Sequence, residues 1–256
     1  MCELFGVISP VKLELNELLK EFFSHGREHP NGWGMAFFYE NAVSLEKQPE
    51  ESHKSLYLKQ RLQSKIEADR MIAHIRLATR GTISYENTHP FVMGDTSGRR
   101  WTLAHNGTIF EGSCLSSLSH RQQGQTDSER ILSYIIGRVN EKLEQKKELS
   151  AQERFALIDK ITCEITPKNK VNFLLFDGEL MYAHTNCQNS LYCCRREGAV
   201  VWSTTPLDHR VWKAVPMNTL IACQDGEKVY TGTDHENEFY ETEENMRLLF
   251  LDFANL

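Results

Sequence analysis

Apolar strand-like segments lie at both ends of this chain and enclose a central region with helical periodicity. Residues 2–8 form an apolar run suited to a strand that is covered on both faces. Helices are predicted in the middle, at 127–144 and 151–162. After them the pattern returns to strands, and Asp-Gly pairs mark the turns between those strands. This order favours an α+β fold in which large sheets pack against helices.

The first half of the chain carries weaker signals for further elements. Pro10 is expected to end the first strand, and residues 11–23 show the apolar spacing of a helix that Gly26 would terminate. Further strands are predicted at 34–39, 70–76 and 101–105, a surface helix within 50–68, and a long loop at 79–90.

Length and composition bound the size of the fold. The chain has 256 residues, and its 40% apolar content is ample for a sizeable core. There is no internal repeat, no low-complexity linker and no break in composition. We therefore expect residues 1–256 to form a single domain.

Charge and cysteine usage exclude several classes of function. The formal net charge is −6, and no run of Lys or Arg is longer than a pair, so the chain lacks the basic surface that binds nucleic acid or anionic membranes. No apolar stretch approaches the ~18 residues of a transmembrane helix, and the first residues do not form a signal peptide, so we expect a cytoplasmic protein. The 7 cysteines include no C-x-x-C pair, which argues against a zinc site. A small polar substrate and no metal or cofactor are expected.

Cys2 is the first residue with an obvious chemical use. Aminopeptidases usually remove Met1 when the next residue is small, and Cys2 would then carry a thiol and a free α-amine on one carbon. A nucleophile and a base would thus belong to one residue. The alternative is a small apolar residue that begins a buried strand.

Polar residues gather in four further stretches, and each has a purely structural explanation. Asn106-Gly107 has the composition of a turn between two strands. Thr126-Asp-Ser-Glu129 is a capping box that would start a helix whether or not Asp127 binds anything. Arg76 lies in an apolar strand pattern, so it requires a carboxylate partner, either Asp127 or a ligand. The four stretches are residues 29–34, 74–81, 104–107 and 125–129.

Taken together with Cys2, these stretches resemble the class II glutamine amidotransferase domain of the N-terminal nucleophile hydrolases. The stand-alone subfamily related to γ-glutamyl hydrolases is the most similar. The matching motifs are Met-Cys-Glu-Leu-Phe-Gly at the start, His29-Pro-Asn-Gly-Trp-Gly, His74 to Gly81, Asn87-Thr-His-Pro-Phe91, His105-Asn-Gly and Thr126-Asp-Ser-Glu. The resemblance implies a four-layer αββα sandwich, with two mostly antiparallel sheets flanked by helices and Cys2 at the start of a central strand.

The resemblance also assigns catalytic roles. Cys2 matches the nucleophile exposed when Met1 is removed, and the α-amine and thiol have ordinary pKa values close enough for the amine to take the thiol proton. Asn106 and Gly107 match the oxyanion hole, in which a side-chain amide and a backbone N–H stabilise the developing negative charge. His74, His89 and His105 are expected to be structural or gating residues, and no metal ligands are expected.

Substrate binding is assigned in the same way. Arg76 matches the residue that grips the α-carboxylate of glutamine, and Asp127 matches the one that pairs with its α-ammonium. Thr79 and Gly81 are expected to shape the loop over the site. The chain departs from the family pattern where Asn31 stands in place of Asp, and at Leu77 and Arg80.

The implied activity is cleavage of a γ-glutamyl C–N bond through a Cys2 thioester, with release of ammonia from glutamine or of an amine from a γ-glutamyl compound. Either a partner synthase receives the ammonia, or the protein is simply a hydrolase. The alternative is a non-catalytic, glutamine-binding regulatory subunit on the same fold, which a retained Met1 would favour.

Overall fold

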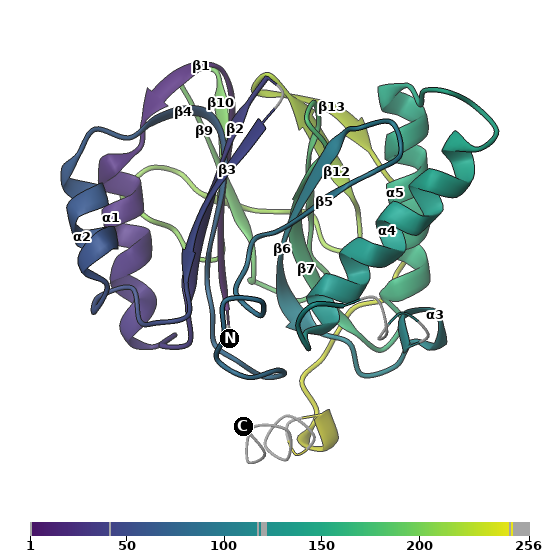
Figure 1. Ribbon diagram of the computed structural model, residues 1–256, viewed down its shortest axis with the longest axis horizontal. Coiled ribbons are helices and arrows are strands. Elements are labelled where there is room, and N and C mark those ends of the chain that lie inside the picture. The colour runs from purple at the N-terminus through teal and green to yellow at the C-terminus, as the bar shows by residue number, and fades with distance from the viewer. Residues whose placement is uncertain (1, 41, 117, 119–121, 246, 248–256) are drawn as a thin grey trace.

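Two β-sheets stack face to face, and helices cover both outer faces (Figure 1). The structure is a computed structural model that describes residues 2–40, 42–116, 118, 122–245 and 247. In these ranges all neighbouring strands run antiparallel. The layers confirm the predicted four-layer αββα sandwich.

Sheet A is built around the N-terminal strand. Its strands are β1 (Glu3–Glu14), β2 (Trp33–Tyr39), β3 (Ala42–Gln48), β4 (Glu67–Ile75), β9 (Tyr192–Arg196), β10 (Ala199–Ser203) and β11 (Lys213–Ala214). Their order across the sheet is β11-β9-β10-β1-β4-β2-β3. As predicted, β1 is therefore central, with β4 on one side and β10 on the other.

Sheet B comes mostly from the second half of the chain. Its strands are β5 (Phe91–Gly94), β6 (Arg100–Thr108), β7 (Lys170–Phe176), β8 (Met181–His184), β12 (Ile221–Gln224) and β13 (Glu227–Thr231). Their order is β13-β12-β8-β7-β6-β5. The adjacent strands β6 and β7 lie opposite β1, with Cα atoms within 8 Å across the gap between the sheets.

Helices α1 (Asn16–Ser24) and α2 (Leu56–Gln63) lie outside sheet A, and α4 (Asp127–Leu143) and α5 (Ala151–Ile165) lie outside sheet B (Figure 1). A 3-10 turn at His25–Arg27 follows α1, and the short α3 spans Ser113–Ser116. Apolar clusters fill the space under each helix layer and between the sheets. None of the helices in the described ranges is long and apolar enough to cross a membrane.

The two sheets approach closely at Gly6 of β1. A Cβ atom built on Gly6 would lie 2.7 Å from Cδ1 of Leu174 on β7, which is closer than real Cβ atoms come. Leu174 is fully buried and belongs to the cluster between the sheets. The separation of the sheets near the centre of β1 therefore depends on a residue without a side chain.

Strand β1 is longer than predicted. It continues through Pro10 to Glu14, and its pairing with β4 shifts register between Ile8 and Leu13. Pro10 is exposed within this irregular stretch, where its missing N–H removes no regular ladder bond. The prediction that Pro10 ends the strand was therefore wrong, and α1 begins at Asn16 instead of residue 11.

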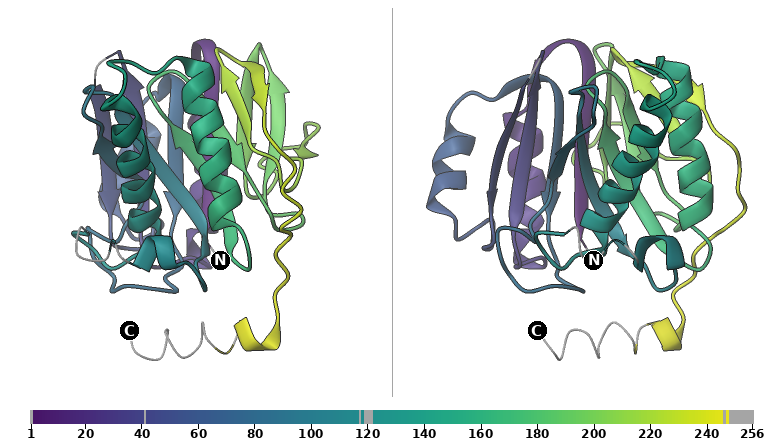
Figure 2. Two further views of the ribbon diagram at one scale, coloured as in Figure 1. Left: turned by 90° about the vertical axis from the view of Figure 1, so that its right-hand side faces the viewer. Right: turned by 45° about the vertical axis from the view of Figure 1, so that its right-hand side comes forward.

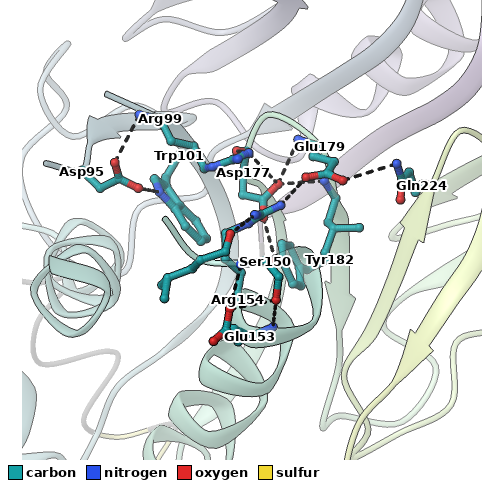
Figure 3. Close-up of polar contacts among 12 residues, drawn as sticks. Asp95, Arg99, Trp101, Ser150, Glu153, Arg154, Asp177, Glu179, Tyr182 and Gln224 are labelled. Carbon is teal, nitrogen blue, oxygen red and sulfur yellow. Dashed lines mark hydrogen bonds and ion pairs between the residues drawn. The ribbon is translucent and has the colours of Figure 1, made fainter. Parts of the chain in front are cut away.

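A buried polar network fixes the connection between β7 and β8 (Figure 3). The carboxylate of Asp177 accepts hydrogen bonds from Arg154 Nε at 2.7 Å and from the Tyr182 hydroxyl at 2.8 Å. The turn itself closes through a bond from the Asp177 N–H to the Leu180 carbonyl at 3.2 Å. The connection is thus longer than the predicted two-residue Asp177-Gly178 turn, and Arg154 of α5 holds it in place.

Candidate active site

Cys2 immediately precedes β1, at the end of the sheet stack where the chain starts (Figures 1 and 2). Its thiol donates a hydrogen bond to the Leu77 carbonyl at 3.3 Å, and its sulfur accepts one from the Leu77 N–H at 3.4 Å. Leu77 lies just beyond β4, which pairs with β1. The neighbouring strand therefore holds the thiol in a partly buried position.

Burial, more than the surrounding charges, sets the protonation of Cys2. Burial raises the pKa of the thiol, while the Leu77 hydrogen bond and the Arg76 charge lower it and Asp127 raises it further. The net shift is upward, so the thiol carries its proton at neutral pH and needs a base to become a nucleophile. The predicted removal of Met1 concerns a residue outside the described ranges.

Arg76 follows β4 and is 2% exposed. Its guanidinium donates to the carbonyls of Arg80 at 2.8 Å, Gly81 at 3.0 Å and Thr82 at 3.0 Å. In the part of the chain that the structure describes, it forms no ion pair with a carboxylate. Asp127 acts on Arg76 only through a longer-range charge interaction, which opposes the lowering of the Arg76 pKa by burial.

The Arg76 guanidinium holds the loop over the site through hydrogen bonds to the backbone carbonyls at 80–82. Gly81 accepts one of the Arg76 hydrogen bonds and has a φ of +77°, a conformation that glycine adopts without strain. A Cβ atom at Gly81 would also lie 3.0 Å from Nδ2 of Asn87. Thr79 lies half-buried in the same loop. That Thr79 and Gly81 shape the loop over the site stays a prediction.

Asn106 and Gly107 lie within strand β6, which corrects the alternative reading of a turn between two strands. Asn106 pairs with Asn172 of β7, and Gly107 pairs with Val171. Asn106 is 2% exposed, and its Nδ2 has no hydrogen-bond partner among the residues that the structure describes. A buried donor without a partner costs about 1–3 kcal/mol, so it marks a place where an acceptor is expected to bind.

Strand alternation gives the direction of the Asn106 side chain. Ala104, two residues earlier on β6, belongs to the apolar cluster between the sheets. Residues two apart on a strand face the same side, so Asn106 also faces the gap between the sheets, toward β1. At Gly107 a Cβ atom would lie 1.9 Å from the Lys170 carbonyl oxygen, so only glycine fits.

Asp127 is the first residue of α4 and is 6% exposed. Its Oδ2 accepts a hydrogen bond from the Ile109 N–H at 2.8 Å. The predicted capping box is only half formed. The Thr126 hydroxyl accepts from the Glu129 N–H, but the Glu129 carboxylate accepts from the N–H groups of Gln123 and Gly124.

Three buried histidines, His74, His89 and His105, lie near these residues. His74 Nε2 lies 3.3 Å from the carbonyl oxygen of His105, which joins the end of β4 to β6. The rings of His74 and His89 stack with centroids 4.1 Å apart. Burial lowers the pKa of His74 to about 3, so this imidazole is neutral at physiological pH. This environment is consistent with the expected structural role.

Sequence reasoning missed the ion pairs of Glu3, the residue after Cys2, with His25 and His29, which we call the Glu3 anchor. The carboxylate of Glu3 is 6% exposed and lies 2.8 Å from His25 Nδ1 and 3.4 Å from His29 Nε2. Although burial opposes this, the hydrogen bonds and charges of the two histidines lower the Glu3 pKa to about 2. The first residue of β1 is thereby tied to the segment after α1.

A second missed contact involves a residue at which the chain departs from the family pattern. Asn31 Oδ1 accepts from the Ala78 N–H at 2.9 Å, and the Asn31 N–H donates to the Arg76 carbonyl at 3.0 Å. The side-chain oxygen of Asn31 therefore fixes the backbone after Leu77 without a charge, and its backbone N–H fixes the backbone before Leu77.

Asn172 was also missed. It is fully buried and lies directly opposite Asn106 on β7. The available signal was a polar residue at an inward position next to the apolar run that begins at Phe173.

Cys2, Arg76, Asn106 and Asp127 thus come from the ends of β1, β4, β6 and α4. Charge interactions link Cys2, Arg76 and Asp127, and the His74–His105 contact joins β4, which precedes Arg76, to β6, which contains Asn106. A cavity of about 570 Å³ lies elsewhere, beside Asp95 and Gly178, and none of the predicted site residues lines it.

Comparison with known proteins adds an independent finding. Residues 1–199 match the family described as glutamine amidotransferases class-II. The Escherichia coli protein YafJ, which carries the provisional name of a glutamine amidotransferase, is 30% identical over 77% of this chain and 76% of its own length.

Solved structures show the same fold. A crystal structure of a predicted glutamine amidotransferase from Pseudomonas aeruginosa superposes with a TM-score of 0.63 and 21% identity, covering 90% of this chain and 100% of that chain. Glutamine phosphoribosylpyrophosphate amidotransferase from B. subtilis superposes with a TM-score of 0.65 and 16% identity, covering 90% of this chain and 48% of that chain.

Proposed function

Because this chain belongs to the class II glutamine amidotransferase family, we propose that it cleaves the side-chain amide of glutamine, or of a related γ-glutamyl compound, through a thioester on Cys2. The observation that carries the proposal is the buried Nδ2 of Asn106, which faces the gap between the sheets and has no hydrogen-bond partner among the described residues. An amide donor in this position suits the oxygen of a substrate carbonyl.

The first step is proton transfer from sulfur. After removal of Met1, the α-amine of Cys2 accepts the thiol proton, and the thiolate attacks the γ-carbonyl carbon of the substrate. The raised pKa of the thiol explains why this base is needed. The carbonyl oxygen becomes negative, and Asn106 Nδ2 and the Gly107 N–H donate to it.

The second step releases the amine and restores the enzyme. The C–N bond breaks, and the leaving nitrogen takes the proton from the α-ammonium of Cys2, so that ammonia or an amine departs. Water then attacks the thioester, its proton passes to the α-amine, and glutamate leaves as the thiolate re-forms and is protonated.

Arg76 and Asp127 orient the substrate in this proposal. Three carbonyls occupy N–H donors on both Nη1 and Nη2 of Arg76, so binding of the substrate α-carboxylate exchanges part of these hydrogen bonds. Asp127 pairs with the α-ammonium, and Thr79 and Gly81 position the loop. Opposite charges at the two ends of the zwitterion point the γ-amide toward Cys2.

The proposal covers residues 1–256 as a single amidotransferase domain. Ammonia released at Cys2 passes either to a partner synthase or to solvent. In the second case the protein is a γ-glutamyl hydrolase.

The test compares wild type with Cys2→Ala, after intact mass has shown that Met1 is absent. Release of ammonia or amine is measured with glutamine, glutathione and other γ-glutamyl compounds. We expect turnover of at least one compound, and a loss of at least about 10⁴-fold in Cys2→Ala. A diazoketone analogue of glutamine should label Cys2 in wild type.

Cys187→Ala is the matched control, because Cys187 is also a partly buried, unpaired cysteine. It should keep full turnover and full labelling at Cys2. Equal turnover in Cys2→Ala and wild type would refute the nucleophile assignment. Saturable binding of glutamine without turnover, in protein that lacks Met1, would favour the non-catalytic regulatory subunit.

A further inference from the structure

Asn172 is the second buried amide that faces the gap between the sheets. It lies directly opposite Asn106 in the antiparallel pair of β7 and β6, and opposite residues on paired strands face the same side. Leu174, two residues later on β7, packs in the cluster between the sheets, which gives Asn172 the same inward direction. Asn172 is fully buried.

Hydrogen bonds fix the orientation of the Asn172 amide. Its Oδ1 accepts from the Thr185 hydroxyl at 2.8 Å and from the Asn186 N–H at 3.2 Å. The reverse orientation would place the NH₂ group against the Asn186 N–H, which can only donate. The Thr185 hydroxyl is itself 2.9 Å from the Ser190 hydroxyl, so the acceptor side of the amide is held rigidly.

The donor side of the same amide has no partner. Nδ2 of Asn172, like Nδ2 of Asn106, is buried and without a hydrogen bond in the described ranges. Two neighbouring NH₂ groups that face one gap are complementary to an atom with two lone pairs. A carbonyl oxygen fits this description, whereas the nitrogen of a substrate amide is itself a donor.

We propose that Asn172 is a further catalytic residue, whose Nδ2 donates to the scissile carbonyl oxygen alongside Asn106. This inference rests on the proposed amide cleavage. The α-carboxylate is the other acceptor on the substrate, but its negative charge is better matched by Arg76 across the gap on sheet A. A neutral amide donor suits an oxygen that becomes charged only in the transition state.

Asn172→Asp and Asn172→Ala test the assignment. The aspartate keeps an acceptor for Thr185 and Asn186 but offers no donor, and the alanine removes the amide without adding charge. With the substrate that shows Cys2-dependent turnover, we expect kcat to fall by about 10²-fold in both variants, with KM changed by less than about threefold.

A glutamine-derived aldehyde supplies a readout that a purely structural role would not move. The aldehyde forms a tetrahedral adduct with the Cys2 sulfur, and its oxygen occupies the position of the oxyanion. Its Kd should rise in each variant by a factor similar to the fall in kcat/KM, because the same donor is lost. Thermal unfolding of each variant is measured in parallel.

Asn169→Ala is the matched control. Asn169 is also buried and directly precedes β7, but its amide is fully bonded to backbone, including the Phe110 N–H at 2.7 Å and the Ile165 carbonyl at 2.9 Å. Its loss should lower Tm while kcat stays within about threefold of wild type.

The outcomes separate the two proposals. Suppose that wild type turns over substrate through Cys2, but the Asn172 variants keep the wild-type kcat or raise only KM. The catalytic role of Asn172 is then wrong, and the proposed function still stands. If the variants do not fold, Thr185→Val decides, since it frees the amide to rotate and should still lower kcat. Wild type without Cys2-dependent turnover overturns the proposed function, and this inference with it.

Discussion

In the sheet A half of the site, the polar groups already have partners, whereas in the sheet B half two buried donors lack them. Cys2 Sγ is bonded to Leu77, and Arg76 donates to three carbonyls of its own loop. Across the gap, Nδ2 of Asn106 and Nδ2 of Asn172 are unpartnered within the ranges that the structure describes.

This difference predicts different costs when a substrate binds. On sheet A, the hydrogen bonds of Cys2 and Arg76 must partly exchange for bonds to the substrate, which costs binding free energy and couples binding to the loop position. On sheet B, the donors need no rearrangement before the oxygen becomes negative. Changes at Arg76 should therefore act mainly on KM, and changes at Asn106 or Asn172 mainly on kcat.

Among the variants that test the difference between the two sheets, Asn106→Leu is expected to have the largest effect on catalysis. We expect kcat to fall by about 10²- to 10³-fold, because one donor to the oxyanion is lost. The free energy of unfolding should not decrease, since the leucine removes a buried donor for which the described part of the chain offers no partner. Steady-state kinetics and urea unfolding check both parts.

The contrasting variant is Asn169→Leu, which loses an amide whose hydrogen bonds are all made. It should be destabilised by about 2 kcal/mol or more while keeping kcat. If Asn106→Leu were destabilised as much as Asn169→Leu, the idea that the Asn106 donor is left unsatisfied for the sake of substrate binding would be wrong.

A smaller effect is expected from Arg76→Lys on the sheet A side. Lysine cannot hold three carbonyls and a carboxylate at once, so KM should rise by about 10-fold and kcat should change less. The loop at 80–82 should also be cut faster by a protease, because it loses its bonds to Arg76. Arg99→Lys, at the far end of β6, should change neither quantity, and an unchanged KM in Arg76→Lys would argue against the carboxylate grip.

The smallest effect on catalysis is expected from Glu3, whose contribution is to stability. Its pKa is lowered to about 2 in the folded protein, so its stabilising contribution is complete above the unfolded value near 4.5. That contribution is lost as pH falls from about 4.5 through about 2, and its size is on the order of 3 kcal/mol. His25 has the opposite sign, because its pKa is raised and its contribution fades as pH rises through that raised value.

Urea unfolding of wild type and Glu3→Gln between pH 2.5 and pH 7 measures the Glu3 contribution. The variant should be less stable at pH 6, and the two curves should converge toward pH 2.5. Glu17→Gln is the control, because Glu17 pairs with Lys20 on the surface and contributes little. If the free energies of unfolding of wild type and Glu3→Gln changed in parallel with pH, the ion pairs of Glu3 would not contribute the stability proposed here.

Apolar periodicity and helix caps, which are local signals, predicted the α+β class and most elements, whereas the four-layer order came from the family resemblance. Asn106-Gly107 shows where local signals fail. The pair has the composition of a turn, but pairing with Asn172 and Val171 keeps it in a strand. Pro10 was misjudged for the same reason, since β1 resumes its pairing with β4 at Leu13.

The candidate site was predicted through motifs, but its hydrogen bonding was not. The resemblance named Cys2, Arg76, Asn106 and Asp127 as neighbours. It did not indicate that Arg76 would bind its own loop or that Asn172 would complete a pair of donors. Those features depend on which distant segments pack together, and a linear sequence does not contain that information directly.

The absence of a side chain at Gly6 has a consequence for chemistry at Cys2, which directly precedes β1. The distance between the two sheets near Cys2 is set by the close contact between Gly6 and Leu174. The Cys2 sulfur lies on the sheet A side of the gap, and the amide donors of Asn106 and Asn172 lie on the sheet B side. In Gly6→Ala, the added methyl group should push the two sheets apart and slow the reaction without altering any atom that reacts.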